Sequence, residues 1–452
     1  MDAIRDKVPP VRGRATLERL FRLSEHGTSL RTELRAGLTT FLTMAYIAFI
    51  NPSILAEAGM DRGAVFVATC LAAALGSLVM GLLANWPVAM APGMGLNAYF
   101  AYVVVLGMGF TWQAALGAVF ISGLCFLAVT LTGLRRIIVD GIPRSMRIAI
   151  TVGIGLFLAI IALKSAGVVA ASPATLVTLG DLHKPGTVLA VLGFLMVAAL
   201  SVRKVKGALL LSILAVTALS FVVAGNGFGG LVSMPPSIAP TFLALDIAGA
   251  LSAGLLNVVL VLFLVELFDA TGTLMGVASR AGLLAPERAA AGGDRGLDRA
   301  LMADSAAIFA GSLLGTSSTT AYLESASGVE EGGRTGLTAV TVAALFLLCL
   351  FFAPLAGSVP AYATAPALFY VACLMLRELV DLDWDDLTEV VPACVTALLM
   401  PFTYSIATGI SFGFLTYAAL KLLTGRARAV KPVVWVIAAL FLIKFVVTGA
   451  AH

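Results

Sequence analysis

The sequence predicts an all-α protein that crosses a membrane many times. Of its 452 residues, 60% are hydrophobic and only 12% are charged, whereas soluble domains carry about a quarter charged residues. The apolar residues gather in runs of about 17 to 25, the length that a helix needs to cross roughly 30 Å of hydrocarbon. Two of these runs are interrupted at matching places in the two halves of the chain. These three observations favour two inverted halves, the first with seven spans.

The apolar segments can be placed in order along the chain. They lie near residues 34–56, 64–84, 94–106, 112–133, 147–168, 186–203, 207–225, 248–277, 298–314, 320–330, 335–353, 360–379, 387–403, 405–424 and 432–450. Two of them, 94–106 and 320–330, are too short to cross, and each follows a break rich in Gly, Pro, Ser or Thr. We therefore expect half a helix at each place. The final segment, 432–450, contains Lys444 and does not fit an even number of spans.

The distribution of Lys and Arg among the short loops predicts the orientation. The basic clusters are residues 1–33; Arg135, Arg136, Arg144 and Arg147; Arg203, Lys204 and Lys206; Arg280, Arg288, Arg295 and Arg299; and Arg426, Arg428 and Lys431. Each cluster follows an even number of spans when a half helix counts as one, so all are expected in the cytoplasm. The loop 225–247 has no Lys or Arg and is expected outside. The N-terminal segment lacks the apolar core and cleavage site of a secretory signal, which also favours the cytoplasm.

The two short segments share a local sequence. "GLNAYFAY" (95–102) and "STTAYLES" (318–325) both contain an Ala-Tyr step, and their tyrosines, Tyr99 and Tyr322, are 322 − 99 = 223 positions apart. This distance is about half the chain. Two broken helices at matching places in inverted repeats indicate a substrate site near the middle of the bilayer.

The stretch "GTSSTT" (315–320) is unusually polar for a membrane segment. Non-helical backbone in lipid leaves N–H and C=O groups unpaired at a cost of several kcal/mol each, so it must be buried in protein or line a polar cavity. We expect Gly315–Thr319 to form a short strand that pairs with Pro87–Gly93. The half helices then begin at about Gly95 and Thr320. Their N-termini, with Gly93, Gly95 and Ser318, would offer backbone N–H donors to a small polar ligand.

Acidic side chains within the apolar segments are the strongest functional signal. Glu266 and Asp269 lie three residues apart in "VLVLFLVELFDATGTLMG", which places them on one helix face. Glu324 is expected one turn into the second half helix, with Asn97 at the equivalent place in the first. Carboxylates at this depth mark proton relays, ion paths or ligand sites. Because no Lys or Arg is available in the central spans, a proton could bind the pair near physiological pH. The alternatives are ion pairing or backbone capping for the acids, and simple capping for Asn97.

Other polar residues carry less information. Asp304 is either a helix N-cap or a partner behind the site. The acidic run Asp381–Glu389 is expected to be a solvated cytoplasmic loop. The five cysteines, scattered singly in apolar segments, are expected to be small core residues, and no histidine lies within a span, so no metal site is indicated. No phosphate-binding loop for ATP is present, no cofactor is implied, and the net charge of +4 points to no nucleic-acid partner.

Four sequence blocks carry a resemblance to a known family. They are "TELRAGLTTFLTMAYIAFINPSIL" (32–55), "APGMGLNAYF" (91–100), "VELFDATGTLMG" (265–276) and "GTSSTTAYLESASGVEEGGRTGLTAV" (315–340). With these blocks the sequence resembles the AzgA-type purine permeases, the adenine/guanine/hypoxanthine branch of the nucleobase–cation symporters. The similarity runs over nearly the whole chain.

The resemblance implies fourteen spans in two inverted sevens, divided between a core and a gate domain. The expected ranges are a cytoplasmic segment 1–33, core spans 34–133 and 248–353, and gate spans 147–225 and 360–450. It also implies a homodimer in the cytoplasmic membrane. In a related uracil transporter, glutamates of spans eight and ten and a tyrosine hold the base, and these match Glu266, Glu324 and Tyr322. Its histidine is replaced here by Ala270 beside Asp269, which leaves open which acid carries the proton.

The resemblance therefore predicts proton-coupled uptake of a purine base by movement of the core against the gate. The expected substrate contacts are Asn97, Glu266, Asp269, Thr319, Thr320, Tyr322 and Glu324, with Glu266 or Asp269 coupled to the proton. An anion carrier of the same architecture, a uracil or xanthine permease, and a cation exchanger or channel are the alternatives. An intramembrane enzyme is disfavoured because Ser317 and Ser318 have no His or Lys nearby. Which purine is preferred is not decided by the residues.

Overall fold

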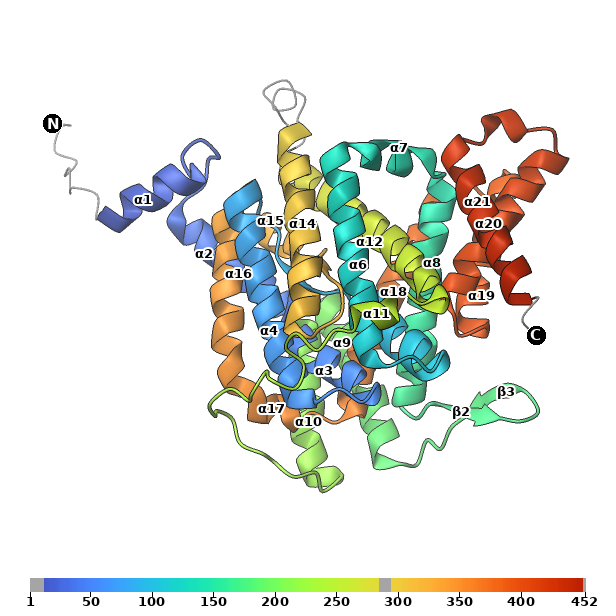
Figure 1. Cartoon of the computed structure of the whole chain (residues 1–452). Coiled ribbons are helices and arrows are strands. Elements are labelled where there is room, and N and C mark those ends of the chain that lie inside the picture. The colour runs from blue at the N-terminus through green and yellow to red at the C-terminus, as the bar shows by residue number, and fades with distance from the viewer. Residues whose placement is uncertain (1–11, 284–293, 450–452) are drawn as a thin grey trace.

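The computed structural model describes residues 12–283 and 294–449, and it is a bundle of helices (Figure 1). Its helices are α1 (Arg12–Phe21), α2 (Leu30–Met44), α3 (Ile47–Glu57), α4 (Arg62–Val79), α5 (Met94–Ala98), α6 (Trp112–Thr132), α7 (Leu134–Gly141), α8 (Arg144–Ser165), α9 (Pro185–Val202), α10 (Ala208–Val223), α11 (Ile247–Ala250), α12 (Ala253–Arg280), α14 (Asp294–Leu314), α15 (Ser325–Glu330), α16 (Gly336–Cys349), α17 (Ala353–Gly357), α18 (Ala361–Leu376), α19 (Leu387–Phe402), α20 (Ile406–Leu423) and α21 (Pro432–Gly449). Its strands are β1 (Met90–Pro92), β2 (Val169–Ser172), β3 (Leu176–Leu179) and β4 (Thr319–Ala321).

The predicted membrane spans are found as helices. Within the described residues, nine helices are long and apolar enough to cross a membrane, and four shorter apolar helices accompany them. The first span is divided into α2 and α3, which meet at Ala45 and Tyr46. The C-terminal segment is the helix α21, whose Phe441 lies against Phe414 of α20. The predicted all-α polytopic fold is therefore confirmed.

The two interrupted spans meet through their strands. β1 and β4 pair antiparallel, with Ala91 opposite Thr320, so the predicted strand pairing is confirmed. The second strand is shifted from its expected place, because it begins at Thr319, where the prediction ended it. The second half helix is also displaced. It does not begin at Thr320, since β4 and a turn come first, and α15 begins only at Ser325.

The register of β1 and β4 is set by three residue pairs. Met90 lies opposite Ala321, Ala91 opposite Thr320 and Pro92 opposite Thr319. The equivalence of Tyr99 with Tyr322, and of Asn97 with Glu324, stays a prediction.

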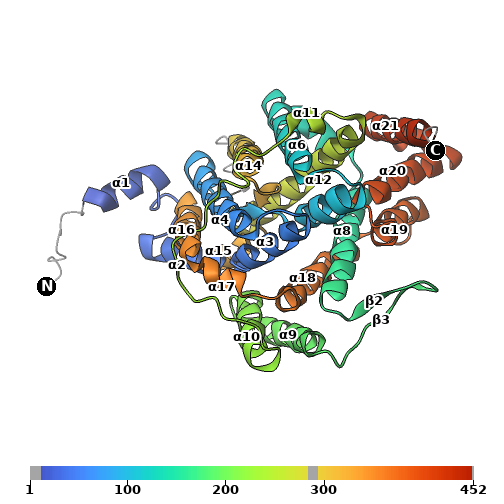
Figure 2. The same cartoon turned by 60° about the horizontal axis from the view of Figure 1, so that its bottom comes forward.

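Some elements have no counterpart in the sequence prediction. The hairpin β2–β3 projects from the end of the molecule opposite α7 (Figures 1 and 2), and β3 is exposed along its whole length. Its strands are only four residues long, too short to produce an apolar run. Cys125 and Cys373 are exposed, so the expectation that all five cysteines are core residues is wrong for these two.

The acidic run Asp381–Glu389 is only partly a solvated loop. Lys421, which is 5% exposed, forms an ion pair of 2.6 Å with Glu389. Asp386 caps α19 by accepting from the Thr388 hydroxyl and amide, and these hydrogen bonds lower the pKa of its carboxyl. The prediction is wrong for this end of the run because its partner, Lys421, follows more than 30 residues later.

Candidate functional site

The strongest cluster of buried polar side chains lies where the two strands meet α12. Its fully or nearly fully buried members are Asn51, Asn97, Ser122, Glu266, Asp304, Ser317, Ser318, Thr319 and Thr320. They come from spans that are far apart in sequence. Because an unpaired polar group inside a membrane protein is costly, such a cluster needs either internal partners or a ligand.

The first break presents a side-chain amide. Asn97 lies within α5, and its Oδ1 accepts a hydrogen bond from the Ser317 hydroxyl. Its Nδ2 has no partner among the described residues. α5 can lie here because Gly95 has no side chain, and a Cβ at this position would collide with Ile154 of α8. The Asn97 amide is thus held by one atom and free to donate with the other.

The carboxylate of Glu266 is placed in a similar way. The Ser122 hydroxyl of α6 donates to its Oε2, while its Oε1 has no partner within the described chain. The Ser318 hydroxyl lies beside this carboxylate, but the two do not form a well-shaped hydrogen bond. Glu266 therefore offers one buried oxygen to a donor that the described residues do not supply.

Asp269 differs from Glu266 although both lie on α12, which crosses the middle of the molecule (Figure 1). Glu266 is fully buried, whereas Asp269 is exposed. The charges that act on Asp269 include those of Glu378 and Glu324. The exposed face of α12 continues from Asp269 to Gly272. Asp269 is thus the member of the pair that water reaches.

The second break holds a carboxylate at the end of a turn. Glu324 is the N-cap residue of α15, and its Oε1 accepts from the Tyr46 hydroxyl at 2.6 Å. The Tyr322 hydroxyl donates to the carbonyl of Pro92 at 2.6 Å and ties the turn to β1. Backbone amides with acceptors in this segment are those of Ala321, Tyr322, Ser325, Ala326 and Ser327. These amides are occupied, in contrast to the free donors expected at this half helix.

Asp304 acts behind the strands. It lies within α14, so it is not the N-cap of that helix, and its Oδ1 accepts from the Ala321 amide at 2.8 Å and the Thr320 hydroxyl at 3.2 Å. Its Oδ2 has no partner among the described atoms. The Thr319 side chain lies against Gly76 and Gly311, so both threonines of β4 face the surrounding helices.

The backbone donors expected at the breaks are only partly available. The Gly93 amide donates to the carbonyl of Ser318 at 2.8 Å and closes the strand pair. Substrate contacts by Gly95, Ser318, Thr319 and Thr320 therefore stay predictions.

Sequence reasoning missed several residues that arrange the site. Tyr46 holds Glu324, and Ser122 and Ser317 hold Glu266 and Asn97. Asn51 donates to Thr69 at 2.7 Å and to Thr316 at 2.8 Å, which ties the first span to the second break. Tyr46 and Asn51 were detectable as isolated polar residues in the apolar segment 34–56. Ser122 gave no signal, since a single serine is ordinary in a membrane helix.

Comparison with known proteins gives matches over nearly the whole chain. A family model described as "Permease family" matches residues 31–412. The chain is 50% identical over 438 residues to the adenine permease AdeP of Escherichia coli (strain K12), covering 97% of this chain and 98% of that protein. It is 44% identical over 448 residues to the guanine/hypoxanthine permease PbuG of Bacillus subtilis (strain 168), with coverage of 95% and 99%.

Among solved structures, the fold is similar to the transmembrane domain of the cyanobacterial bicarbonate transporter BicA. The TM-score is 0.65 at 17% identity, and the match covers 84% of this chain and 97% of that one. SLC26A9 matches with a TM-score of 0.64 at 11% identity, over 92% and 69% of the two chains. At these identities the likeness concerns the fold alone.

Proposed function

The chain belongs to the permease family, and from this premise we propose that it carries purine nucleobases across the cytoplasmic membrane together with protons. The relatives that support the substrate class are the adenine and the guanine/hypoxanthine permeases, which match almost end to end. The observation that carries the proposal is the pair of half-satisfied groups at the junction of the strands. Glu266 keeps one buried oxygen without a donor, and Asn97 keeps one amide nitrogen without an acceptor.

A purine base complements these two groups. Its ring carries both N–H donors and nitrogen or carbonyl acceptors along one edge, so it can donate to Glu266 and accept from Asn97. Each contact would satisfy a buried group that otherwise costs about 1–3 kcal/mol. Glu324, oriented by Tyr46, is proposed to accept a second ring N–H. A site of this kind rejects analogues that lack the matching hydrogen bond.

We assign the exchangeable proton to Asp269 and base binding to Glu266. Asp269 is exposed, whereas Glu266 is enclosed, so only Asp269 can exchange a proton with water without the site opening. A proton on Asp269 would reduce the charge that must cross the low-dielectric barrier with the substrate.

The movement proposed is that of a core domain against a gate domain. α4 packs on α14 and α16, while α8 packs on α18 and α19, which supports the expected division. The ion pair between Lys206, before α10, and Glu331, after α15, joins the two groups of helices and would have to break during such a movement. A homodimer and a cytoplasmic N-terminus belong to the same proposal.

Uptake of labelled adenine and hypoxanthine tests the proposal in cells that lack their own purine transport. Glu266→Gln and Glu324→Gln are expected to reduce uptake at least about a hundredfold at equal protein in the membrane, because each removes an acceptor for a ring N–H. Asp269→Asn is expected to abolish dependence on the proton gradient together with accumulation. Wild-type uptake in all three variants would refute the assignment.

An anion carrier is the competing function on this fold. The groups at the junction argue against it, because within the described chain no Lys or Arg forms an ion pair with Glu266, Asp269 or Glu324. Competition of labelled purine uptake by bicarbonate and chloride is expected to be absent.

A further inference from the structure

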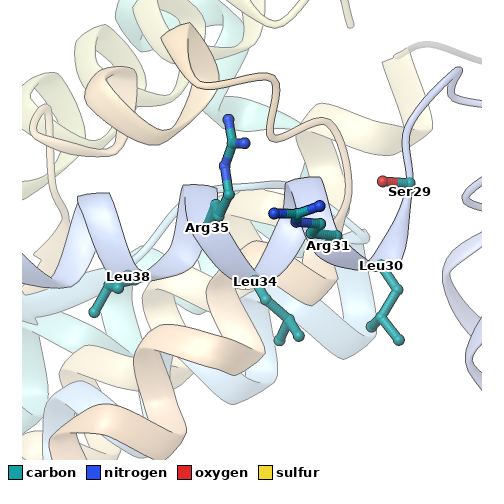
Figure 3. A pocket seen from close by; sticks show the side chains of 6 residues that line it. All are labelled: Ser29, Leu30, Arg31, Leu34, Arg35 and Leu38. Carbon is teal, nitrogen blue, oxygen red and sulfur yellow. The ribbon is translucent and has the colours of Figure 1, made fainter.

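The first turns of α2 form an open groove on the outside of the bundle, away from the junction of the strands. The groove has a volume of about 520 Å³ and is lined by Ser29, Leu30, Arg31, Leu34, Arg35 and Leu38. Figure 3 shows Arg31 and Arg35 along one edge of the outer face of the helix, with Leu30, Leu34 and Leu38 along the neighbouring edge. Leu34 and Leu38 are 45% and 46% exposed. The groove therefore combines a cationic rim with an apolar floor.

The opposite face of α2 packs against the rest of the protein. Glu33 is fully buried and accepts from the Thr338 hydroxyl at 2.6 Å and the Arg334 amide at 2.9 Å. This buried carboxylate caps the start of α16 and is not available to neutralise the rim. The rotation of α2 is thus fixed, and the arginines and leucines remain on the outer side.

The positive charge of the rim is only partly neutralised. Within the described residues, no acceptor lies within hydrogen-bonding distance of the Arg31 guanidinium. Arg35 lies 3.4 Å from Glu331, but Glu331 is shared with Lys206. Glu330, the adjacent carboxylate, is exposed. Arg31, Arg35 and Lys206 therefore outnumber the carboxylates that face them.

The groove lies at the N-terminal end of the first apolar span, Leu30–Glu57. α1, immediately before it, carries further basic residues and lies beside the bundle (Figure 2). The charge distribution among the loops assigns this end to the cytoplasmic leaflet, the side on which anionic lipids attract basic segments.

We propose that this groove binds the phosphate of an anionic phospholipid, with Arg31 and Arg35 on the phosphate and an acyl chain along Leu34 and Leu38. Arginine suits the headgroup because its planar guanidinium donates two parallel hydrogen bonds to phosphate oxygens. The leucines, exposed in the protein alone, are covered by the chain of the same lipid. The inference requires only that the protein spans a membrane and does not depend on the proposed substrate.

The purified full chain in detergent, titrated with phosphatidylglycerol or phosphatidylcholine and analysed by native mass spectrometry, tests the inference. The wild type is expected to retain phosphatidylglycerol in preference to phosphatidylcholine. Arg31→Gln is expected to weaken this binding about fivefold, and Arg31→Gln with Arg35→Gln about twentyfold or more. Arg203→Gln, the same change of charge at the exposed end of α9, is the matched control and is expected to leave the binding unchanged.

Three results would overturn the proposal. They are equal retention of the two lipids, an equal loss in Arg203→Gln, and displacement of phosphatidylglycerol by soluble glycerol 3-phosphate, which would show a site for a free phosphate. A fold defect is not expected in Arg31→Gln, because the Arg31 guanidinium forms no hydrogen bond with the described residues. The thermal unfolding midpoint of this variant is therefore expected to stay the same. Leu38→Asn is expected to weaken binding as well, since the acyl chain would lose its apolar floor.

Discussion

The two interrupted spans are built on the same strand but continue differently. In the first, β1 is followed almost at once by α5, and the polar residue Asn97 lies inside that helix. In the second, β4 is followed by a turn that brings Glu324 to the N-cap of α15. The two breaks thus share a strand, but they place their candidate substrate groups differently, Asn97 within a helix and Glu324 in front of one.

The two breaks are also constrained by different interactions. Gly95 is small because α5 must approach Ile154 of α8, so the first break is limited by packing. Glu324 is held by Tyr46 from the first span, so the second is limited by hydrogen bonding. Substitutions that change only packing or only hydrogen bonding can therefore show what each break contributes to transport.

Among the substitutions that distinguish the two breaks, the largest effect is expected for Gly95→Ala. The added Cβ would collide with Ile154, and overpacking of this kind costs about 1–3 kcal/mol, so purine uptake and the unfolding midpoint should both fall, uptake by about tenfold or more. Gly276→Ala is the matched control, because a Cβ at Gly276 meets nothing within 4 Å. Partial recovery in Gly95→Ala with Ile154→Ala would confirm the cause, and a fully active single variant would contradict it.

Tyr46→Phe is expected to reduce uptake about tenfold. The substitution removes the hydroxyl that donates to Glu324, and a hydrogen bond to a charged group contributes about 1.5–3 kcal/mol. Tyr370→Phe on α18 serves as the control, and unchanged uptake in Tyr46→Phe would contradict the role of the hydroxyl.

Ser317→Ala tests whether the hydrogen bond to Asn97 in the first break contributes to binding of the base. Asn97 loses the donor to its Oδ1 and can turn its amide, so the apparent affinity for the base should fall about fivefold, visible as a rise in KM with kcat little changed. Ser325→Ala removes a hydroxyl that accepts from the Ala89 amide in the second break and should affect stability more than KM. The reverse pattern would show that Ser317 does not orient Asn97.

The smallest effect is expected for Thr319→Val. The Thr319 hydroxyl is buried without a partner in the described structure and lies against Gly311 of α14, so an isosteric methyl should change uptake by less than about twofold and leave stability equal or slightly higher. The KM values for adenine and hypoxanthine, measured in Thr319→Val and in the wild type, show whether Thr319 contacts the base. A marked rise in either would show that Thr319 contacts the base, as the sequence prediction holds.

Much of this fold could be predicted from the distribution of apolar residues along the sequence. Apolar runs located the spans, and the polar stretch from Gly315 to Thr320 predicted a break because so many small and hydroxyl residues are unusual within a membrane span. Glu266, Asp269 and Glu324 were detectable because charges are rare there. The contact of Tyr46 with Glu324 was not, since it joins residues 278 positions apart. Nor could the pattern show that Asp269 is exposed while Glu266 is buried, because periodicity places both on one face without saying what lies opposite.

The pairing of β1 with β4 also limits how the protein can be made. Pro92 and the Tyr322 hydroxyl that binds its carbonyl are 230 residues apart, and at about 5–20 residues per second a ribosome needs roughly 10–50 seconds to travel that far. During this interval the first broken span has no strand to satisfy its backbone. The backbone of the first break is therefore completed only after the second half of the chain has been made.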